Sequence, residues 1–236
     1  MEKLRRPGLR RLGLTAAGAV AVAALVAAVG VGRADPGVRY DTQPEALAFG
    51  KEMYDFQTVE QMTATSHLVV FGTVTSVEPG RLASADEDPA AVGGDIRLRT
   101  VTINQYDVLH NPKNLIIPPS ITLEEEGWDE EGRGYISNNV AWSAVGDTGY
   151  FFLRRAVGTS NPYTYQLASS DGRPLVVDGA LRPSNAENEL ATSITTMAPS
   201  FLNNTVVAAS GQVAAGTLTE SMPTAELPQP PEESGE

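Results

Sequence analysis

The chain has 236 residues, no cysteine and a formal net charge of −12. An acidic chain repels the phosphates of nucleic acids, so the composition argues against a nucleic-acid partner. Without cysteine the chain forms no disulfide, and its folded part must be stabilised by its own hydrophobic core. Hydrophobic residues make up 42% of the chain, which is typical of a globular protein rather than a disordered one.

The first 34 residues have the layout of an export signal or a membrane anchor. An uncharged run rich in alanine, valine and glycine, residues 12–32, follows five cations: Lys3, Arg5, Arg6, Arg10 and Arg11. As a helix this run would span about 31 Å, close to the thickness of a bilayer core. Its length favours a retained membrane-spanning helix. The weakly apolar composition and a cleavage position after Ala34 keep a cleaved signal peptide open.

The cations of this segment predict the side on which the rest of the chain lies. Basic residues stay at the cytoplasmic face of a membrane. We therefore expect the cell membrane as the location, with an extracytoplasmic C-terminal domain, or a secreted protein if cleavage follows Ala34. The pair Arg10 and Arg11 leaves both the general and the twin-arginine export routes open.

We divide the chain into four segments. They are a signal or anchor (1–34), a linker (35–57), a β-barrel domain with a short N-terminal and a C-terminal helix (58–205), and a disordered acidic, proline-rich tail (206–236). Thr58 and Gln61 have the spacing of a capping box and predict a short helix through Thr65.

Alternating β-branched and polar residues predict most of the domain to be strands. The predicted strands are residues 67–77, 97–109, 120–125, 149–155 and 163–168, with a short edge strand at 135–142. Gly72 inside the first strand, and a slip in the alternation near Gln105 in the second, predict bulges. Asp178 and Gly179 predict a tight hairpin turn.

The chain then changes to a helical pattern. Ser184 and Glu187 predict a second capping box. A helix that closes the domain is predicted by an apolar stripe at helical spacing: Leu190, Ile194, Met197 and Phe201. The whole pattern predicts a mainly β fold, a small OB-like antiparallel barrel with flanking helices after the N-terminal membrane-spanning helix. A β-sandwich remains the alternative.

Five segments between residues 66 and 182 share a pattern with known proteins: HLVVFGTVTSVEPG, TVTINQYDVLHNP, SITLEEEG, VGDTGYFFLRR and YQLASSDGRPLVVDGAL. They resemble a family of uncharacterised exported actinobacterial proteins with an OB-like barrel. The strand order also has a distant likeness to netrin-like modules, which are OB barrels. Those modules carry disulfides, which a chain without cysteine cannot form. The resemblance implies a fold and an exported location, and it transfers no catalytic residue.

Acidic residues gather after the third predicted strand. Our candidate binding residues are Glu124, Glu125, Glu126, Trp128 and Asp129. Carboxylate oxygens can bind cations, and a tryptophan ring beside them is a surface on which a sugar can pack. The spacing is not that of a calcium-binding loop, and a solvated acidic loop is the plainer interpretation.

Residues for other chemistry are scarce. His67 and His110 are the two histidines. They lie at ends of predicted strands, and two histidines alone do not make a metal site. The chain has no nucleophile elbow and no phosphate-binding glycine loop. We therefore assign no catalytic residue, metal or cofactor.

These observations favour a non-catalytic domain of the cell envelope. We expect it to bind or scaffold a surface component, either a protein or the cell wall, through the long loops 81–95 and 127–134. The membrane would be contacted through the N-terminal helix. The alternative is a cell-wall hydrolase that uses the carboxylates of residues 124–131, with or without a metal.

Overall fold

The computed structural model describes residues 39–48, 52–83, 96–185 and 188–224. By its internal contacts the chain divides into residues 1–31 and 32–236, and every described residue belongs to the second unit. The predicted anchor and the last 12 residues of the predicted tail, 225–236, therefore lie outside the described residues. Within the described part, no helix is long and apolar enough to cross a membrane.

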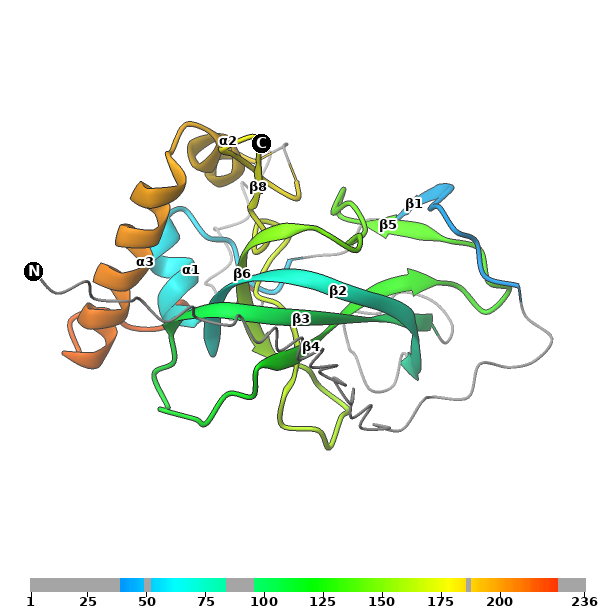
Figure 1. Cartoon of the computed structure of the whole chain (residues 1–236), viewed down its shortest axis with the longest axis horizontal. Helices are drawn as coiled ribbons and strands as arrows, with labels where there is room; N and C mark the ends of the chain where they lie inside the picture. The colour runs from blue at the N-terminus through cyan, green and yellow to red at the C-terminus, as the bar shows by residue number, and fades with distance from the viewer. Residues whose placement is uncertain (1–38, 49–51, 84–95, 186–187, 225–236) are drawn as a thin grey trace, which may run out of the picture. The chain divides into compact units, whose positions relative to one another are not determined.

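The described part is mainly β, as predicted. One sheet has seven strands in the order β2-β3-β4-β7-β6-β8-β9 (Figure 1). Their bounds are Leu68–Ala83 (β2), Ile96–His110 (β3), Ser120–Trp128 (β4), Thr148–Arg155 (β6), Thr164–Leu167 (β7), Leu175–Val177 (β8) and Ala180–Arg182 (β9). Two further short strands, Ala46–Ala48 (β1) and Tyr135–Ser137 (β5), pair in parallel at the end of the molecule away from the helices.

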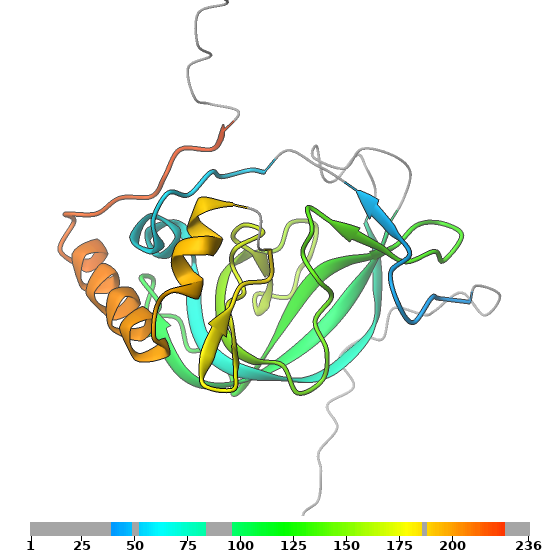
Figure 2. The ribbon, with the colours of Figure 1, turned by 90° about the horizontal axis from the view of Figure 1, so that it is seen from above.

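The pairings of the large sheet return to their starting strand. β2 pairs with β3 along one edge and with β6 along the other, both antiparallel. β3 pairs with β4, β4 with β7 in parallel, and β7 with β6. Figure 2 shows the curvature of β2 and β3 that accompanies this arrangement.

The long strand β2 bends at irregularities that the sequence predicted in part. The register with β3 shifts between Phe71 and Gly72, which confirms the predicted bulge, and Tyr106 is the β3 residue passed over there. A Cβ atom on Gly72 would lie 2.6 Å from the carbonyl oxygen of Asn104, so only glycine fits. The strand was expected to end at residue 77. It continues to Ala83 because another register shift, between Pro79 and Leu82, absorbs the proline.

Two hydrophobic clusters form the core, one on each face of β2 and β6. The first includes Leu68 and Val70 of β2 with Phe151 of β6, and it lies among the strands. The second includes Val69 and Phe152 and packs under the helices. The consecutive apolar residues of β6 follow from this arrangement, because a strand that is buried on both faces has no polar side.

Three helices cover the second cluster: Val59–Thr65 (α1), Glu189–Thr195 (α2) and Pro199–Ala214 (α3). Thr58 caps α1 by accepting a hydrogen bond from the backbone of Gln61 at 3.2 Å, as its spacing predicted. The hairpin turn at Asp178 and Gly179 is also confirmed. Both residues have positive φ, 52° and 79°, as a type I′ turn requires.

The prediction of one C-terminal helix is wrong. Two helices are present, because Pro199 has no backbone N–H for a continuous helix, and Ala198 before it is extended. Phe201 consequently leaves the predicted stripe and is 59% exposed. Asn188, rather than Ser184, caps α2 through the backbone of Ala191. Ser184 instead donates to the Ser170 carbonyl.

The structure also moves both expected boundaries of the folded domain outward. Tyr54 and Phe56, in the expected linker, are buried in the core and stack on each other with ring centres 5.6 Å apart. At the other end, α3 continues past residue 205 to Ala214. The predicted edge strand at 135–142 shortens to β5, because Asn138 and Asn139 turn the chain with positive φ.

Candidate functional site

A cleft of about 250 Å³ opens where β4 and β7 separate. These two strands pair only at Thr122–Thr164 and Leu123–Tyr165. Beyond that point the wall of the cleft is formed by β4 on one side and by the end of β7 on the other. Its lining includes Glu124, Glu125 and Glu126 from β4, and Gln166, Leu167, Ala168, Ser169 and Ser170 from β7 and the following turn.

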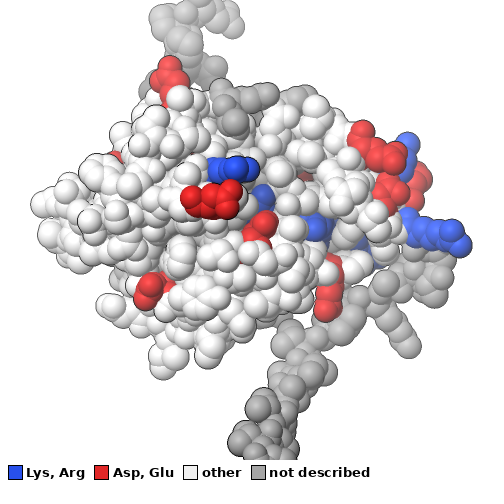
Figure 3. Space-filling view, turned by 45° about the horizontal axis from the view of Figure 1, so that its top comes forward, with Lys and Arg blue, Asp and Glu red and all other residues white. Residues whose placement is uncertain are grey.

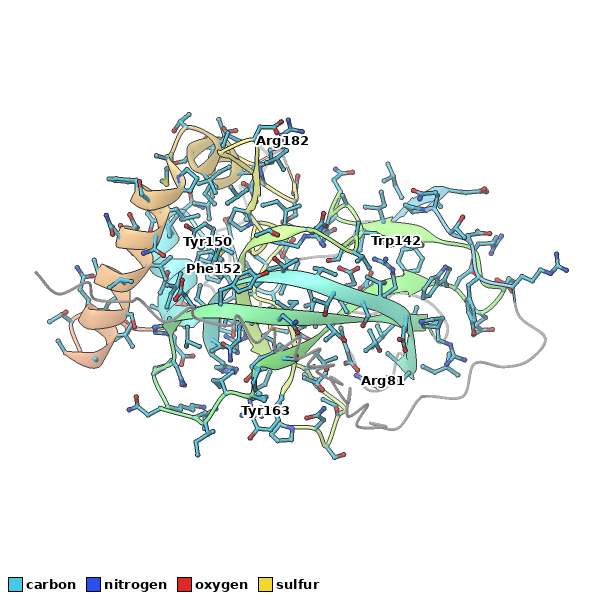
Figure 4. The ribbon with its side chains drawn as sticks, in the orientation of Figure 1. Arg81, Trp142, Tyr150, Phe152, Tyr163 and Arg182 are labelled. Carbon is cyan, nitrogen blue, oxygen red and sulfur yellow. The ribbon has the colours of Figure 1, made fainter. Side chains whose placement is uncertain are left out.

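Other parts of the chain complete the wall. Arg81 and Ala83 come from the end of β2, Ile96 and Leu98 from the start of β3, Arg154 from the end of β6, and Val157 from the loop after it. Glu52, Met53, Ser137, Asn138, Val140 and Trp142 close the remaining side. Figure 4 labels Arg81 and Trp142 among these side chains. The cleft lining thus combines apolar side chains with carboxylates, amides and hydroxyls.

Glu125 is held at the inner end of the cleft by two arginines. It continues the face of Ile121 and Leu123, the residues of β4 that belong to the strand-enclosed core. Arg99, its register partner on β3, donates to one carboxylate oxygen, and Arg173 donates to the other at 3.3 Å. The backbone and hydroxyl of Ser143 add bonds of 3.0 and 2.9 Å.

The charges of this network are nearly removed from solvent. Arg173 is 1% exposed and Arg99 is 6% exposed. Burial lowers the pKa of the Arg99 guanidinium, an effect that Glu125 opposes. The Arg99 guanidinium also lies 4.3 Å from the centre of the Trp142 ring. Because the Glu125 carboxylate bonds to both guanidinium groups, the two arginines can be buried, and the network fixes how β3, β4 and the turn after β7 fit together.

Glu124 is held from the outside by Arg81. The Arg81 side chain donates to both carboxylate oxygens, at 3.1 and 3.2 Å, and to the Val157 carbonyl at 2.6 Å. One arginine therefore ties β2, β4 and the loop between β6 and β7 at the mouth of the cleft. Glu126, the third glutamate, lies beside Tyr135. Burial raises the pKa of that tyrosine, and Glu126 raises it further.

Trp128 and Asp129 are not among the described residues that line the cleft. Trp128 is 6% exposed, donates from its indole nitrogen to the Asp41 carbonyl at 2.9 Å, and packs on the ring of Tyr40. Asp129 accepts from Arg133 at 2.7 Å in the turn after β4. Partial burial acts to raise the pKa of Asp129, but the hydrogen bonds from Arg133 lower it by more, so the pKa of Asp129 is lowered overall.

The two histidines are separate from the cleft in the described part of the chain. The Nδ1 atom of His67 accepts from the backbone of Arg155 at 2.9 Å, and that of His110 lies 3.0 Å from the Ser210 hydroxyl. Burial lowers the pKa of both imidazoles. Among the described residues, no group of three or more His, Cys, Asp or Glu side chains could hold a metal ion.

Several cleft residues were missed by the sequence analysis. Glu52 lies in the expected linker, but its carboxylate accepts from the Asn138 amide and from the backbone of Ser170, both at 3.3 Å. Next to this group, Asp171 is 3% exposed, and its Oδ1 atom has no partner among the described residues. Burial raises the pKa of Asp171 to about 6. Neither Glu52 nor Asp171 has an acidic residue next to it in the sequence, and a single acidic residue forms no pattern from which a site can be predicted.

No protein-family model matches the chain. No curated protein matches it either.

Proposed function

We propose that β2, β3, β4, β7 and β6 form a five-stranded barrel of the OB type. Three features support this proposal. The pairings of these strands return to β2, β4 and β7 are the parallel pair, and the side chains between the strands form a separate apolar cluster. A β-sandwich, the alternative, would have two sheets with free edges. The sequence resemblance to exported OB-like proteins agrees with the barrel.

On this proposal the protein is a binding module, and the cleft is where it binds. Ligands of OB folds lie on the face of the second and third barrel strands, between the loops after the first and the fourth. The corresponding strands here are β3 and β4. One observation carries the proposal: a single cleft is lined by residues of both strands and of the chain on either side of them. They are Leu98 of β3, Glu124 and Glu126 of β4, Arg81 at the end of β2, and Val157 in the loop after β6. The ligand would thus lie where other OB folds hold theirs.

The chemistry of the cleft favours a neutral, polyhydroxylated ligand. OB folds bind oligonucleotides and oligosaccharides, and the net charge of −12 disfavours the former. On the face that Figure 3 shows, acidic and basic side chains lie next to one another. This mixture of charges also fits an uncharged ligand better than an oligonucleotide. The Gln166 amide and the Ser137 hydroxyl offer donors and acceptors to sugar hydroxyls, while Leu98 and Trp142 offer apolar surface to a sugar ring. We therefore propose an oligosaccharide, as found in a cell wall.

The proposed place of action is the outer side of the cytoplasmic membrane. The cations ahead of the apolar run at residues 12–32 support export. The family resemblance supports the same location. A domain held at the membrane or secreted from it would meet wall glycans directly, so the proposed ligand and the proposed location are consistent.

A carboxylate-dependent hydrolase is the second candidate, because three glutamates share the cleft. Hydrolysis of a glycosidic bond needs one carboxyl group that donates a proton and another that is free to act as base or nucleophile. Both oxygens of Glu125 already accept hydrogen bonds from arginines, and both oxygens of Glu124 accept from Arg81. These contacts leave neither carboxylate free to act as base or nucleophile, so a binding role fits them better.

The test uses chitohexaose, a soluble N-acetylglucosamine hexamer, as the probe. Titration followed by amide NMR should give saturable shifts confined to the cleft. Gln166→Ala should weaken binding about 2- to 10-fold, the loss expected for one hydrogen bond. Gln212→Ala, on the exposed side of α3, is the matched control and should not change affinity. Shortened sugar products would favour the hydrolase, whereas shifts outside the cleft would contradict the proposed site.

A further inference from the structure

The chain returns to the cleft after its last helix. Beyond α3 the backbone of Ser221 donates to the Thr65 hydroxyl at 2.8 Å, which ties this segment to the end of α1. The backbone of Thr224 then donates to the Met53 carbonyl at 2.8 Å, and its hydroxyl donates to the Glu52 carbonyl. Thr224 is thus fixed to the segment that contains Glu52 and Met53.

That segment is part of the cleft wall. Glu52 and Met53 both line the cleft, and Met53 is 44% exposed. The 12 residues from 225 to 236 therefore continue the chain from a point on the rim of the cleft. A segment tethered this close has an effective concentration in the millimolar range, which a free ligand would have to exceed or outbind.

The composition of residues 225–236 suits the cleft. An uncharged stretch, Leu-Pro-Gln-Pro-Pro at 227–231, lies between Glu226 and Glu232. Proline-rich segments favour the extended polyproline II conformation, so little entropy is lost when they bind to a surface that offers aromatic and apolar side chains. The cleft offers Met53, Leu98 and Trp142 for the apolar stretch.

The charges are compatible as well. Glu124 and Glu125 of the cleft are already paired with arginines, so they do not strongly repel an uncharged segment. Arg154 also lines the cleft, and its positive charge can attract a glutamate that flanks the prolines. An uncharged stretch with acidic ends is thus compatible with a cleft in which Glu124 and Glu125 are paired and Arg154 is part of the lining.

We propose that residues 227–231 occupy the cleft of their own chain and compete there with the external ligand. The inference rests on the proposed function in taking the cleft as the ligand site. It makes the C-terminal segment a built-in competitor, so that ligand binding requires the segment to leave. Its direct test needs no external ligand and is therefore independent of whether the sugar assignment is correct.

The test uses paramagnetic broadening in the full chain, held in detergent micelles. Because the chain has no cysteine, Ser234→Cys provides a single site for a nitroxide label. We expect the label to broaden the amide signals of Gln166 and Ser169 in the cleft, but not that of Val207 on α3. The matched control keeps the label and the length and replaces residues 227–231 by Gly-Ser-Gly-Ser-Gly. There the broadening should fall by several-fold.

Equal broadening with both sequences would overturn the proposal, because tethering alone would then explain it. Mixing labelled protein with unlabelled, isotope-enriched protein tests a second copy as the occupant, and broadening in that mixture would also overturn the proposal. Chitohexaose that shifts the cleft signals should relieve the broadening. If the sugar binds in the cleft and the broadening persists, competition is refuted. If broadening is specific and the sugar does not bind, the sugar assignment alone fails.

Discussion

Arg173 reaches Glu125 from a turn 48 residues further along the chain, with a distance of 3.3 Å between guanidinium nitrogen and carboxylate oxygen. Arg99 contacts the same carboxylate from β3. One carboxylate therefore offsets part of the positive charge of two buried arginines at the inner end of the cleft. Removal of the carboxylate would leave both cations buried without their partner.

We expect Glu125→Ala to destabilise the protein by about 3–5 kcal/mol, the usual cost of an uncompensated buried charge. Urea unfolding measures this change in the free energy of unfolding. Glu131→Ala is the control, because the side chain of Glu131 is 66% exposed and its removal should cost less than about 1 kcal/mol. Equal costs for the two variants would contradict the role of the buried network.

The second prediction compares two phenylalanines. Phe152 is fully buried between β6 and the helices, whereas Phe201 is 59% exposed on α3. Figure 4 shows Phe152 and its neighbour Tyr150 on the part of β6 near the helices. Phe152→Ala should cost about 3–5 kcal/mol, because it leaves a cavity. Phe201→Ala should cost less than about 1 kcal/mol, and a similar loss from both would contradict the two-helix arrangement.

The third prediction is that alanine has opposite effects on stability at two glycines, Gly72 and Gly211. A Cβ on Gly72 would clash with the backbone of Asn104, whereas one on Gly211 would meet no atom within 4 Å. Gly72→Ala should therefore destabilise the protein. Gly211→Ala, inside α3, should stabilise it by about 0.5–1 kcal/mol through its better helix propensity. Thermal unfolding of both variants is the measurement, and a stabilised Gly72→Ala would refute the close approach of β2 and β3.

Local patterns in the sequence account for most of the strands. Alternation predicts β2 and β3, and an apolar run predicts β6. The Asp178-Gly179 pair predicts the hairpin of β8 and β9, because all these signals act over a few residues. The single C-terminal helix failed for a local reason as well. The spacing of Leu190, Ile194 and Phe201 continues across Pro199, but proline ends a helix at the residue before it.

The cleft was predictable only where its residues are consecutive. Glu124, Glu125 and Glu126 drew attention as a run of acids, and all three reach the cleft. Gln166 and Asn138 lie in other segments, and only the three-dimensional fold brings them together. The burial of Arg99 and Arg173 was likewise invisible, since arginine is rarely buried unless it is paired and the pairing joins residues far apart in the chain.

The location of the domain gives a fourth prediction. The cations before residue 12 should keep the N-terminus in the cytoplasm and place residue 236 outside. Alkaline phosphatase fused after Glu236, which is active only outside the cytoplasm, should be active. Replacing Arg5, Arg6, Arg10 and Arg11 by glutamate should abolish that activity. Activity of a cytoplasm-only reporter at the same position would contradict the orientation, and the mass of the mature N-terminus would distinguish an anchor from a cleaved signal.

The last prediction concerns pH and rests on Asp171, the buried aspartate beside the cleft. One of its oxygens accepts from the Asn188 amide, and the other has no partner among the described residues. Burial raises its pKa in the folded protein to about 6 from the ordinary value of 3.8. The folded state therefore binds a proton more tightly than the unfolded state. The contribution of this group to stability is most favourable below pH 4 and is lost as the pH rises through 6.

Asp171→Asn cannot ionise and should remove this pH dependence. Since one pKa unit corresponds to about 1.4 kcal/mol, the penalty at pH 7 is at most about 3 kcal/mol. Urea unfolding at pH 4 and pH 7 should show that the variant gains stability relative to the wild type at the higher pH. Asp178→Asn, in the hairpin turn where asparagine also tolerates positive φ, controls for a general loss of charge. An equal pH dependence in wild type and Asp171→Asn would show that this carboxylate ionises in the folded protein without cost.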